Sequence, residues 1–350
     1  MKKTLVAVAA MAAVTGAMAQ ASIYGTIDQA YYSAKSTDSS GLTSKTTGIA
    51  GVNNGGSAIG FKATEDLGNG IKVYFQQEIG LYTEKNGGPN SNTVVDSISV
   101  DSGGAYSSHT TTSLNLYENR NSFLGISGAF GSLQVGRQYN LAFYNIIAND
   151  PMGFSGLSSY LAAGAGNPAR TDQLAVYTLP SFVPGLNLQL GKAFGNTAVT
   201  STNSLKTGDS TSWAANYSAN GLYLGFTNET VIGATDVAKE KYGSVTVTYD
   251  FGMAKVGYST TKTTISIASL KGESTSITVP VGGGLSVFYN LNALKSDDGA
   301  GTTGKMKGTQ LGGNYALSKR STVYLQTGKA KVDNALTSTS GFALGLLHAF

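Results

Sequence analysis

Catalysis and metal binding need reactive side chains at particular spacings, and this chain offers few of them. Its 350 residues include no cysteine and two histidines, and His109 and His348 lie too far apart to show metal-ligand spacing. The Ser- and Gly-rich segments contain no nucleophile beside a base, and no strand, Gly-rich loop and helix unit that cradles a phosphate. The sequence therefore predicts no enzyme, no metal site and no cofactor.

Charged side chains are the remaining candidates, and several fall in segments of alternating polarity. Successive side chains of a β-strand point to opposite faces, so apolar residues fix the face of their neighbours. Lys62, Lys72 and Glu78 fall on the polar face, and Arg120 does so if Phe123 lies on the apolar face. The apolar residues that place the first three are Ile59, Phe61, Ala63, Ile71, Val73 and Phe75. Charges along a wetted face act on ions through their electric field.

The elements that carry these side chains repeat from Ser22 onward. Each repeat has an alternating run of about ten residues, a tight Gly- or Asn-rich turn, a second run and a longer polar loop. Seven tight turns lie at 68–70, 129–131, 184–185, 220–221, 251–252, 282–284 and 318–320. They join strands in pairs, and the first and last strands bring the count to 2 × 7 + 2 = 16. The expected strands are 22–34, 57–66, 71–83, 115–127, 131–140, 171–180, 185–195, 210–219, 221–232, 240–250, 252–263, 273–281, 285–295, 306–317, 321–332 and 341–350.

Period-two alternation alone fits either a soluble sandwich or a membrane barrel. No second, complementary apolar face is present to cover the first, and the chain begins with an export signal. No stretch after that signal holds eighteen consecutive apolar residues, which excludes helical spans. We therefore predict an all-β fold: a 16-stranded antiparallel transmembrane β-barrel with short periplasmic turns and long extracellular loops.

Residues 1–19 have the pattern of a signal peptide, and 20–350 form the predicted barrel. Lys2 and Lys3 precede a short apolar run, and Ala17-Met18-Ala19 is a small-x-small cleavage site. Cleavage is expected before Gln20, and the alternative first residue of the mature chain is Ser22. The alternative role of residues 1–19 is a membrane anchor that is not removed. The mature chain keeps 24 − 2 = 22 basic and 20 acidic residues, a balance that gives no support to nucleic-acid binding.

Long loops are expected at 35–56, 84–114, 141–170, 196–209, 233–239, 264–272, 296–305 and 333–340. The third of them, 141–170, differs because it is rich in large apolar residues. These are Ile146, Ile147, Met152, Phe154, Leu157, Tyr160 and Leu161. We expect this loop to fold into the barrel and narrow it, the alternative being a surface loop that packs on a neighbouring subunit.

Several motifs give the chain a family resemblance. They are Ser22-Ile23-Tyr24-Gly25, the run from Gly60 to Gly70, Arg120-Asn121-Ser122-Phe123-Leu124-Gly125, the run from Phe130 to Tyr139, and the ending His348-Ala349-Phe350. Their order and spacing over the whole mature chain resemble the trimeric general porins of Gram-negative bacteria, especially the neisserial and β-proteobacterial branch. The resemblance implies a water-filled channel of the outer membrane for passive diffusion of small hydrophilic solutes and ions.

The resemblance also implies a constriction where wall bases face acids on the inward loop. Arg120 and Arg170 match wall arginines of that motif, whereas Ala58 stands where many relatives have a third. We add Lys62 to the basic side, and Asp150 is the only acid between Leu141 and Arg170. Lys72 and Glu78 are expected to line the lumen. The excess of Lys62, Arg120 and Arg170 over Asp150 at the constriction predicts weak anion preference. The alternative to a general diffusion channel is a substrate-specific channel.

Two further residues carry predictions about assembly. Leu133 and Val135 turn Arg137 toward lipid, where a bare arginine costs about 2–4 kcal/mol near the midplane. The resemblance places it at a homotrimer interface, facing Asp96 or Asp101 of a neighbour, and snorkelling is the alternative. Phe350 ends an apolar alternation and resembles the signal read by barrel-assembly machinery. Outer-membrane lipid and lipopolysaccharide are the remaining expected partners.

Overall fold

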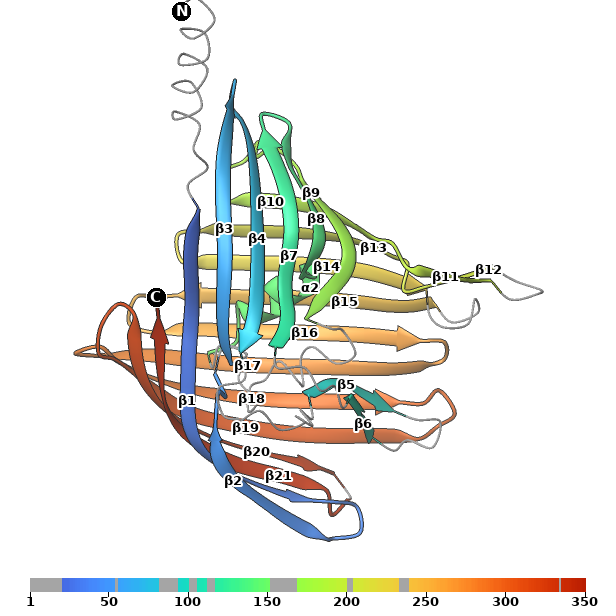
Figure 1. Ribbon diagram of the computed structural model, residues 1–350. Coiled ribbons are helices and arrows are strands. Elements are labelled where there is room, and N and C mark those ends of the chain that lie inside the picture. The colour runs from blue at the N-terminus through green and yellow to red at the C-terminus, as the bar shows by residue number, and fades with distance from the viewer. Residues whose placement is uncertain are drawn as a thin grey trace, which may run out of the picture.

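A computed structural model shows a closed ring of antiparallel strands (Figure 1). It describes residues 21–53, 56–81, 94–100, 106–111, 117–151, 169–199, 204–232, 239–333 and 335–350. The signal-peptide prediction lies outside the described residues. Within them, no helix is long and apolar enough to cross a membrane.

The main sheet contains 17 strands that fill sixteen places in the ring. They are β1 (Ser22–Thr37), β2 (Thr43–Ala50), β3 (Ser57–Gly68), β4 (Ile71–Leu81), β7 (Tyr117–Gly128), β8 (Gly131–Tyr139), β9 (Arg170–Thr178), β10 (Leu186–Ala193), β13 (Ser210–Ala219), β14 (Leu222–Ile232), β15 (Lys239–Asp250), β16 (Lys255–Ile265), β17 (Ala268–Gly282), β18 (Leu285–Asp297), β19 (Thr303–Ala316), β20 (Ser321–Val332) and β21 (Ser338–Ala349). β2 and β3 pair with the two halves of the same edge of β1, so together they fill one place. β21 pairs with the other edge of β1 and closes the ring, which confirms the predicted sixteen-stranded barrel.

The short turns form as predicted, and two of the long loops do not. At 35–56, β1 continues to Thr37 and β2 returns beside it as a hairpin. At 264–272, β16 ends at Ile265 and β17 begins at Ala268. The strand residues of the first segment are mostly polar, and in the second Ile265, Ile267 and Leu270 do not keep a single period of two. Neither segment therefore shows the alternation by which the other strands were recognised. Two small hairpins lie outside the ring: β5 (Val94–Val100) with β6 (Tyr106–Thr111), and β11 (Asn196–Val199) with β12 (Ser204–Thr207).

Exposure follows the alternation of side chains along each strand. On β18, Leu291 is 46% exposed and points outward, while its neighbour Asn290 is 0% exposed and points inward. Asn290 accepts a hydrogen bond from Ser274 on β17, and polar inward contacts of this kind recur around the wall. The apolar face is therefore the outer one, as lipid requires, and the polar face surrounds the lumen.

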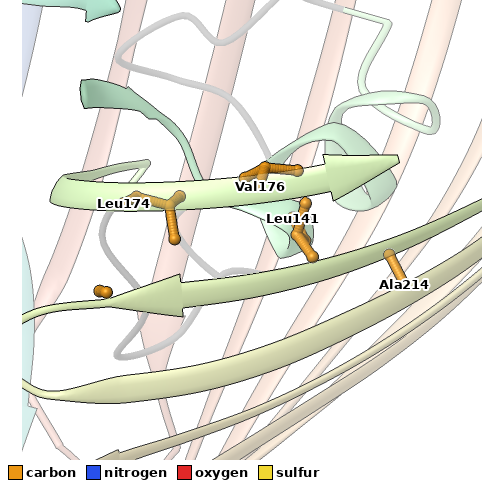
Figure 2. Packing of buried hydrophobic residues seen from close by; sticks show 5 residues of the cluster. Leu141, Leu174, Val176 and Ala214 are labelled. Carbon is orange, nitrogen blue, oxygen red and sulfur yellow. The ribbon is translucent and has the colours of Figure 1, made fainter. Parts of the chain in front are cut away.

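The third loop turns into the barrel directly after β8. Asn140 caps α2 (Leu141–Ile147) by accepting a hydrogen bond from the Phe143 amide at 2.7 Å. Leu141 packs against buried residues of three wall strands, Leu174, Val176, Ala193 and Ala214 (Figure 2). Ala142, Phe143 and Ile146 pack around Tyr242 on β15. The inward fold is therefore confirmed for this part of the loop, while Met152, Phe154, Leu157, Tyr160 and Leu161 lie outside the described residues.

Candidate pore constriction

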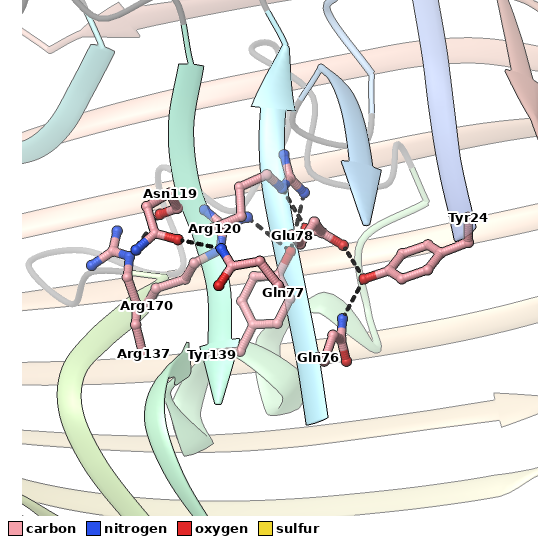
Figure 3. Close-up of polar contacts among 9 residues, drawn as sticks. All are labelled: Tyr24, Gln76, Gln77, Glu78, Asn119, Arg120, Arg137, Tyr139 and Arg170. Carbon is pink, nitrogen blue, oxygen red and sulfur yellow. Dashed lines mark hydrogen bonds and ion pairs between the residues drawn. The ribbon is translucent and has the colours of Figure 1, made fainter. Parts of the chain in front are cut away.

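A buried ion pair joins two neighbouring strands of the inner wall. Arg120 on β7 donates from Nε to Oε1 of Glu78 on β4 at 2.5 Å, and the two residues are 5% and 9% exposed. The second carboxylate oxygen of Glu78 accepts from the Tyr24 hydroxyl at 3.0 Å (Figure 3). Tyr24 in turn accepts from Gln76 at 2.6 Å. Both oxygens of the carboxylate therefore have partners, as a buried charge requires.

Tyr139 connects this pair to the second wall arginine and to α2. Its hydroxyl oxygen accepts from Arg120 at 3.3 Å and from Arg170 at 3.0 Å. The Arg170 guanidinium also lies 4.6 Å from the Tyr139 ring centre. On α2, the ring of Phe143 stacks on Tyr139 at 4.2 Å and 4°. We call Tyr24, Glu78, Arg120, Tyr139 and Arg170 the wall cluster.

The wall cluster shows that Arg120 points inward, although the sequence argument for it was wrong. Phe123 contacts the inward Tyr74 edge-on and pairs in register with Gln76, so it faces the lumen, and Leu124 faces lipid. The register between β4 and β7 shifts between Gln77 and Ile79, where one residue more is present on β7. This bulge reverses the alternation and turns Arg120 back to the inner face.

Lys62 and Lys72 lie nearer the short-turn end of the wall. They line one recess of about 400 Å³, together with Ser22, Ala63, Thr64 and Asp66. The Lys62 ammonium is 5.2 Å from the ring centre of Tyr24, which links it to the wall cluster. Both lysines are exposed, in contrast to Arg120. They lie on the predicted inner face beside one acid, Asp66.

Two asparagines fix the inward segment to the far wall. Asn145 donates to Ser244 on β15 at 2.8 Å, and Asn149 accepts from Ser276 on β17 at 2.6 Å. A Cβ on Gly225 would overlap Asn145, and a Cβ on Gly257 would overlap Asn149. The side-chain amides of both asparagines therefore occupy space that is open only because the wall residue is a glycine, and we call these two positions the glycine seats of α2.

Asp150 follows Asn149 and is partly exposed. Counting places around the ring from β1, β7 is the fourth and β17 the twelfth, eight places apart in sixteen. The segment that carries Asp150 thus lies against the half of the wall opposite Arg120. This arrangement puts the loop acid and the wall base on facing sides of the lumen.

Arg137 points outward as predicted, but its partner belongs to its own chain. Its Nη1 is 2.7 Å from Oδ1 of Asp172 on β9, and its Nε donates to the Asn119 carbonyl at 2.8 Å. Sequence reasoning missed Asp172 because a second bulge, between β8 and β9, brings it to this face. The side chains of Asp96 and Asp101 lie outside the described residues.

Phe350 lies at the seam where the ring closes. Its amide donates to the Gly25 carbonyl at 3.0 Å, and the Gly25 amide donates back to its carbonyl at 3.2 Å. Phe350 is 43% exposed on the outer face, like Phe342, Leu344 and Leu346.

Sequence reasoning also missed a buried network at the same seam. Asp28 on β1 is 0% exposed and accepts from the Tyr324 hydroxyl at 2.7 Å and from the Val52 and Asn53 amides. A lone Asp in an alternating strand gives no signal of this role. The described residues contain no group of three or more potential metal ligands.

A closed barrel with an apolar exterior, a polar interior and a helix folded inside it defines an outer-membrane channel protein. A family model described as Gram-negative porin matches residues 7–335, and the chain belongs to that family. The major outer membrane protein P.IB of Neisseria meningitidis serogroup B is 26% identical, with both chains fully covered. An outer membrane porin protein of Bordetella pertussis is 27% identical, again over both full lengths.

Solved structures share the fold at low sequence identity. An anion-selective porin from Comamonas acidovorans matches with a TM-score of 0.72 and 20% identity, covering 95% of this chain and 100% of that one. OmpF of Salmonella typhi, in complex with daunomycin, matches with a TM-score of 0.71 and 17% identity, covering 94% and 97%. A trimer form of OmpT from Vibrio cholerae matches with a TM-score of 0.66 and 14% identity, covering 95% and 99%. These likenesses show the fold of a porin barrel, in agreement with the family match.

Proposed function

We propose that the chain forms a homotrimeric channel in which small hydrophilic solutes and ions diffuse passively, with weak anion preference and no catalytic step. The observation that carries this proposal is the closed ring with a polar inner wall, against which α2 packs from inside the lumen. A gradient is the only driving force that such a passage needs. Outer-membrane lipid, lipopolysaccharide and the barrel-assembly machinery are the proposed partners during and after insertion.

The anion preference rests on the charges of the inner wall. Lys62, Arg120 and Arg170 form the basic side and Asp150 is the acid of the facing loop. Glu78 binds Arg120 at 2.5 Å and offsets its charge. Lys62, Lys72 and Arg170 then carry most of the preference, which supports a weak rather than a strong effect.

Single-channel recording in planar bilayers tests the channel, and reversal potentials in a KCl gradient test its sign. We expect current steps and a small reversal potential of the sign given by anions. Lys62→Gln should move this potential toward the cation side, because an ion passing about 4 Å from a unit charge in water gains about 1 kcal/mol. Lys241→Gln removes an exposed lysine of the lipid-facing side of β15 and is the matched control. Strong cation preference of the unmodified protein would contradict the proposal.

The substrate-specific channel is the second candidate because Tyr24, Tyr74 and Tyr223 point inward. They lie on β1, β4 and β14, and the last binds Asn145 of α2. Liposome swelling with sugars of graded size separates the two functions. A smooth decline of rate with size supports general diffusion, whereas one solute that passes far faster than its size predicts supports a specific channel.

A further inference from the structure

Four lysines stand directly opposite one another across four neighbouring strands. In register, Lys262 on β16 pairs with Lys271 on β17, Lys271 with Lys295 on β18, and Lys295 with Lys305 on β19. In an adjacent row, Lys307 on β19 pairs with Lys331 on β20. We call these six residues the lysine ladder. Like charges directly opposite each other on a sheet are destabilising. A bound anion on the outer surface of the barrel would offset this repulsion.

The lysine ladder faces away from the lumen. All six residues are exposed, and they alternate with inward side chains such as Leu270 and Leu294, which are 7% and 0% exposed. The four strands β16 to β19 lie side by side (Figure 1). The ladder therefore forms one positively charged area on the outer surface of the barrel.

Acidic groups on the same face do not balance the ladder. Glu273 binds Lys271 at 2.8 Å and Asp333 lies 3.4 Å from Lys307. Asp297 shares the outward face of β18. Six lysines against three acids leave a charge of 6 − 3 = +3. Within the described part of the chain, Lys295 and Lys305 form no ion pair.

The height of the ladder places it at the outer boundary of the apolar band. Lys295 is ten residues beyond Leu285, the first outward apolar residue after the short turn. At about 3.4 Å per residue and a tilt of about 40°, ten residues rise by about 26 Å. The apolar band of an outer-membrane barrel is about 25 Å tall. Phosphate groups of the outer leaflet lie at this level.

The ladder also borders a hollow of suitable size. Thr303, Lys305, Lys331 and Asp333 line a recess of about 400 Å³. Two lysines and a threonine hydroxyl can donate to phosphate oxygens from different directions. Immediately toward the membrane, Tyr289, Leu291 and Leu311 are 40%, 46% and 54% exposed. A charged recess above an apolar surface suits an amphiphile better than a free anion.

We propose that the lysine ladder binds the phosphorylated headgroup of an outer-leaflet glycolipid, with its acyl chains against the apolar surface below. The bound phosphates separate the facing lysines and remove their repulsion. This inference rests on the proposed function, because it needs the long loops to lie outside the cell. The ladder occupies β16 to β20, whereas Arg137, the proposed subunit contact, lies on β8.

Native mass spectrometry of the refolded protein, titrated with diphosphorylated lipid A in detergent, tests the inference. Lys295→Gln/Lys305→Gln should weaken binding about 30-fold, because each lysine near an anionic lipid surface contributes about fivefold. Lys319→Gln/Arg320→Gln removes equal charge at the short-turn end and should retain the affinity. A second readout is the unfolding temperature, which lipid A should raise in the unmodified protein and in the control but not in the ladder variant.

Further arms identify the source of the phosphate. Dephosphorylated lipid A should bind far more weakly, and inorganic phosphate at the same concentration should not compete. Competition by inorganic phosphate, or equal binding by the ladder variant, would overturn the inference. Recording current steps from the same preparation separates the channel function from the lipid site. A preparation that conducts but does not bind lipid A would refute lipid binding by the lysine ladder and leave the channel function intact.

Discussion

Arg120 shows that a buried, paired charge in the lumen stabilises the fold as well as acting on passing ions. Its guanidinium is paired with Glu78 and bonded to Tyr139, so it acts as a structural charge as well as an electrostatic one. Removing one partner of such a pair leaves the other charge uncompensated, at a cost of about 3–5 kcal/mol in buried sites. Lys62, which is exposed, can be changed without that cost.

Glu78→Gln should therefore increase anion preference, because it leaves the Arg120 charge uncancelled. A charge about 4 Å from the ion path changes local ion occupancy by up to about fivefold in water. The reversal potential in a KCl gradient measures the effect, and Glu65→Gln, on the outer face of β3, is the control. A reversal potential that stays fixed, or moves toward cations, would show that the pair does not act on the pore.

The charged residues show how far sequence reasoning reached at this scale. Lys62, Lys72, Glu78 and Arg120 all lie on the inner face as predicted. The pairing of Glu78 with Arg120 could not be derived, because it needs the register of β4 against β7. Two extra residues, one in each bulge, set the directions of Arg120 and Asp172. Each bulge shifts the phase of the side-chain alternation, which the prediction took as constant along the strand.

At the scale of elements, the seven tight turns were the most predictable feature. Asn69 and Asn220 adopt φ of 54° and 50°, each followed by a glycine of positive φ, as tight hairpins demand. The polar extension of β1 with β2 was missed because it has no apolar face to reveal its period. The position of α2 could be predicted as inward, but its seats on β14 and β16 depend on glycines that resemble any others in the sequence.

Gly225→Val should displace α2, because the new side chain would occupy the space of the Asn145 amide. Pushed from the wall toward the pore axis, α2 should lower single-channel conductance. Gly243→Val on β15 is a matched control, since the nearest atom to its Cβ is 3.8 Å away. Equal conductance in both variants would show that the seat does not set the pore size.

Asn145→Ala tests the same attachment by removal rather than by insertion. It deletes the hydrogen bonds to Ser244 and Tyr223, each worth about 1 kcal/mol. The loosened segment should produce larger fluctuations of the open-channel current. Current noise equal to that of the unmodified channel would mean that the apolar contacts of Leu141 and Phe143 hold α2 without this latch.

At the scale of the whole molecule, the trimer depends on what Arg137 meets outside its own chain. If a neighbour's acid contributes, Arg137→Ala should lower the temperature of trimer dissociation more than Asp172→Asn does. The lost charge-assisted hydrogen bond is worth about 1.5–3 kcal/mol per protomer. Native gels after graded heating measure the difference. Equal loss in both variants would assign Arg137 to the intrachain pair alone.

Removing Phe350 should impair assembly, because it deletes both the terminal aromatic and a backbone pair with Gly25. Unpaired backbone groups facing hydrocarbon cost several kcal/mol each. Phe350→Tyr keeps the backbone pair and an aromatic end and is the control. Comparison of outer-membrane yield in cells with refolding into detergent separates the two roles. Loss of yield without loss of refolding supports a signal, and loss of both supports a seam contact.

The pairing of Thr26 with Ala349 also sets an order of events in time. The first strand to leave the ribosome obtains its second neighbour only from the last one made. Until translation ends, two strand edges stay open, and open edges have no stable place among acyl chains. Entry into the bilayer therefore follows completion of the polypeptide, and a product that ends before β21 keeps two unpaired edges instead of closing a smaller pore.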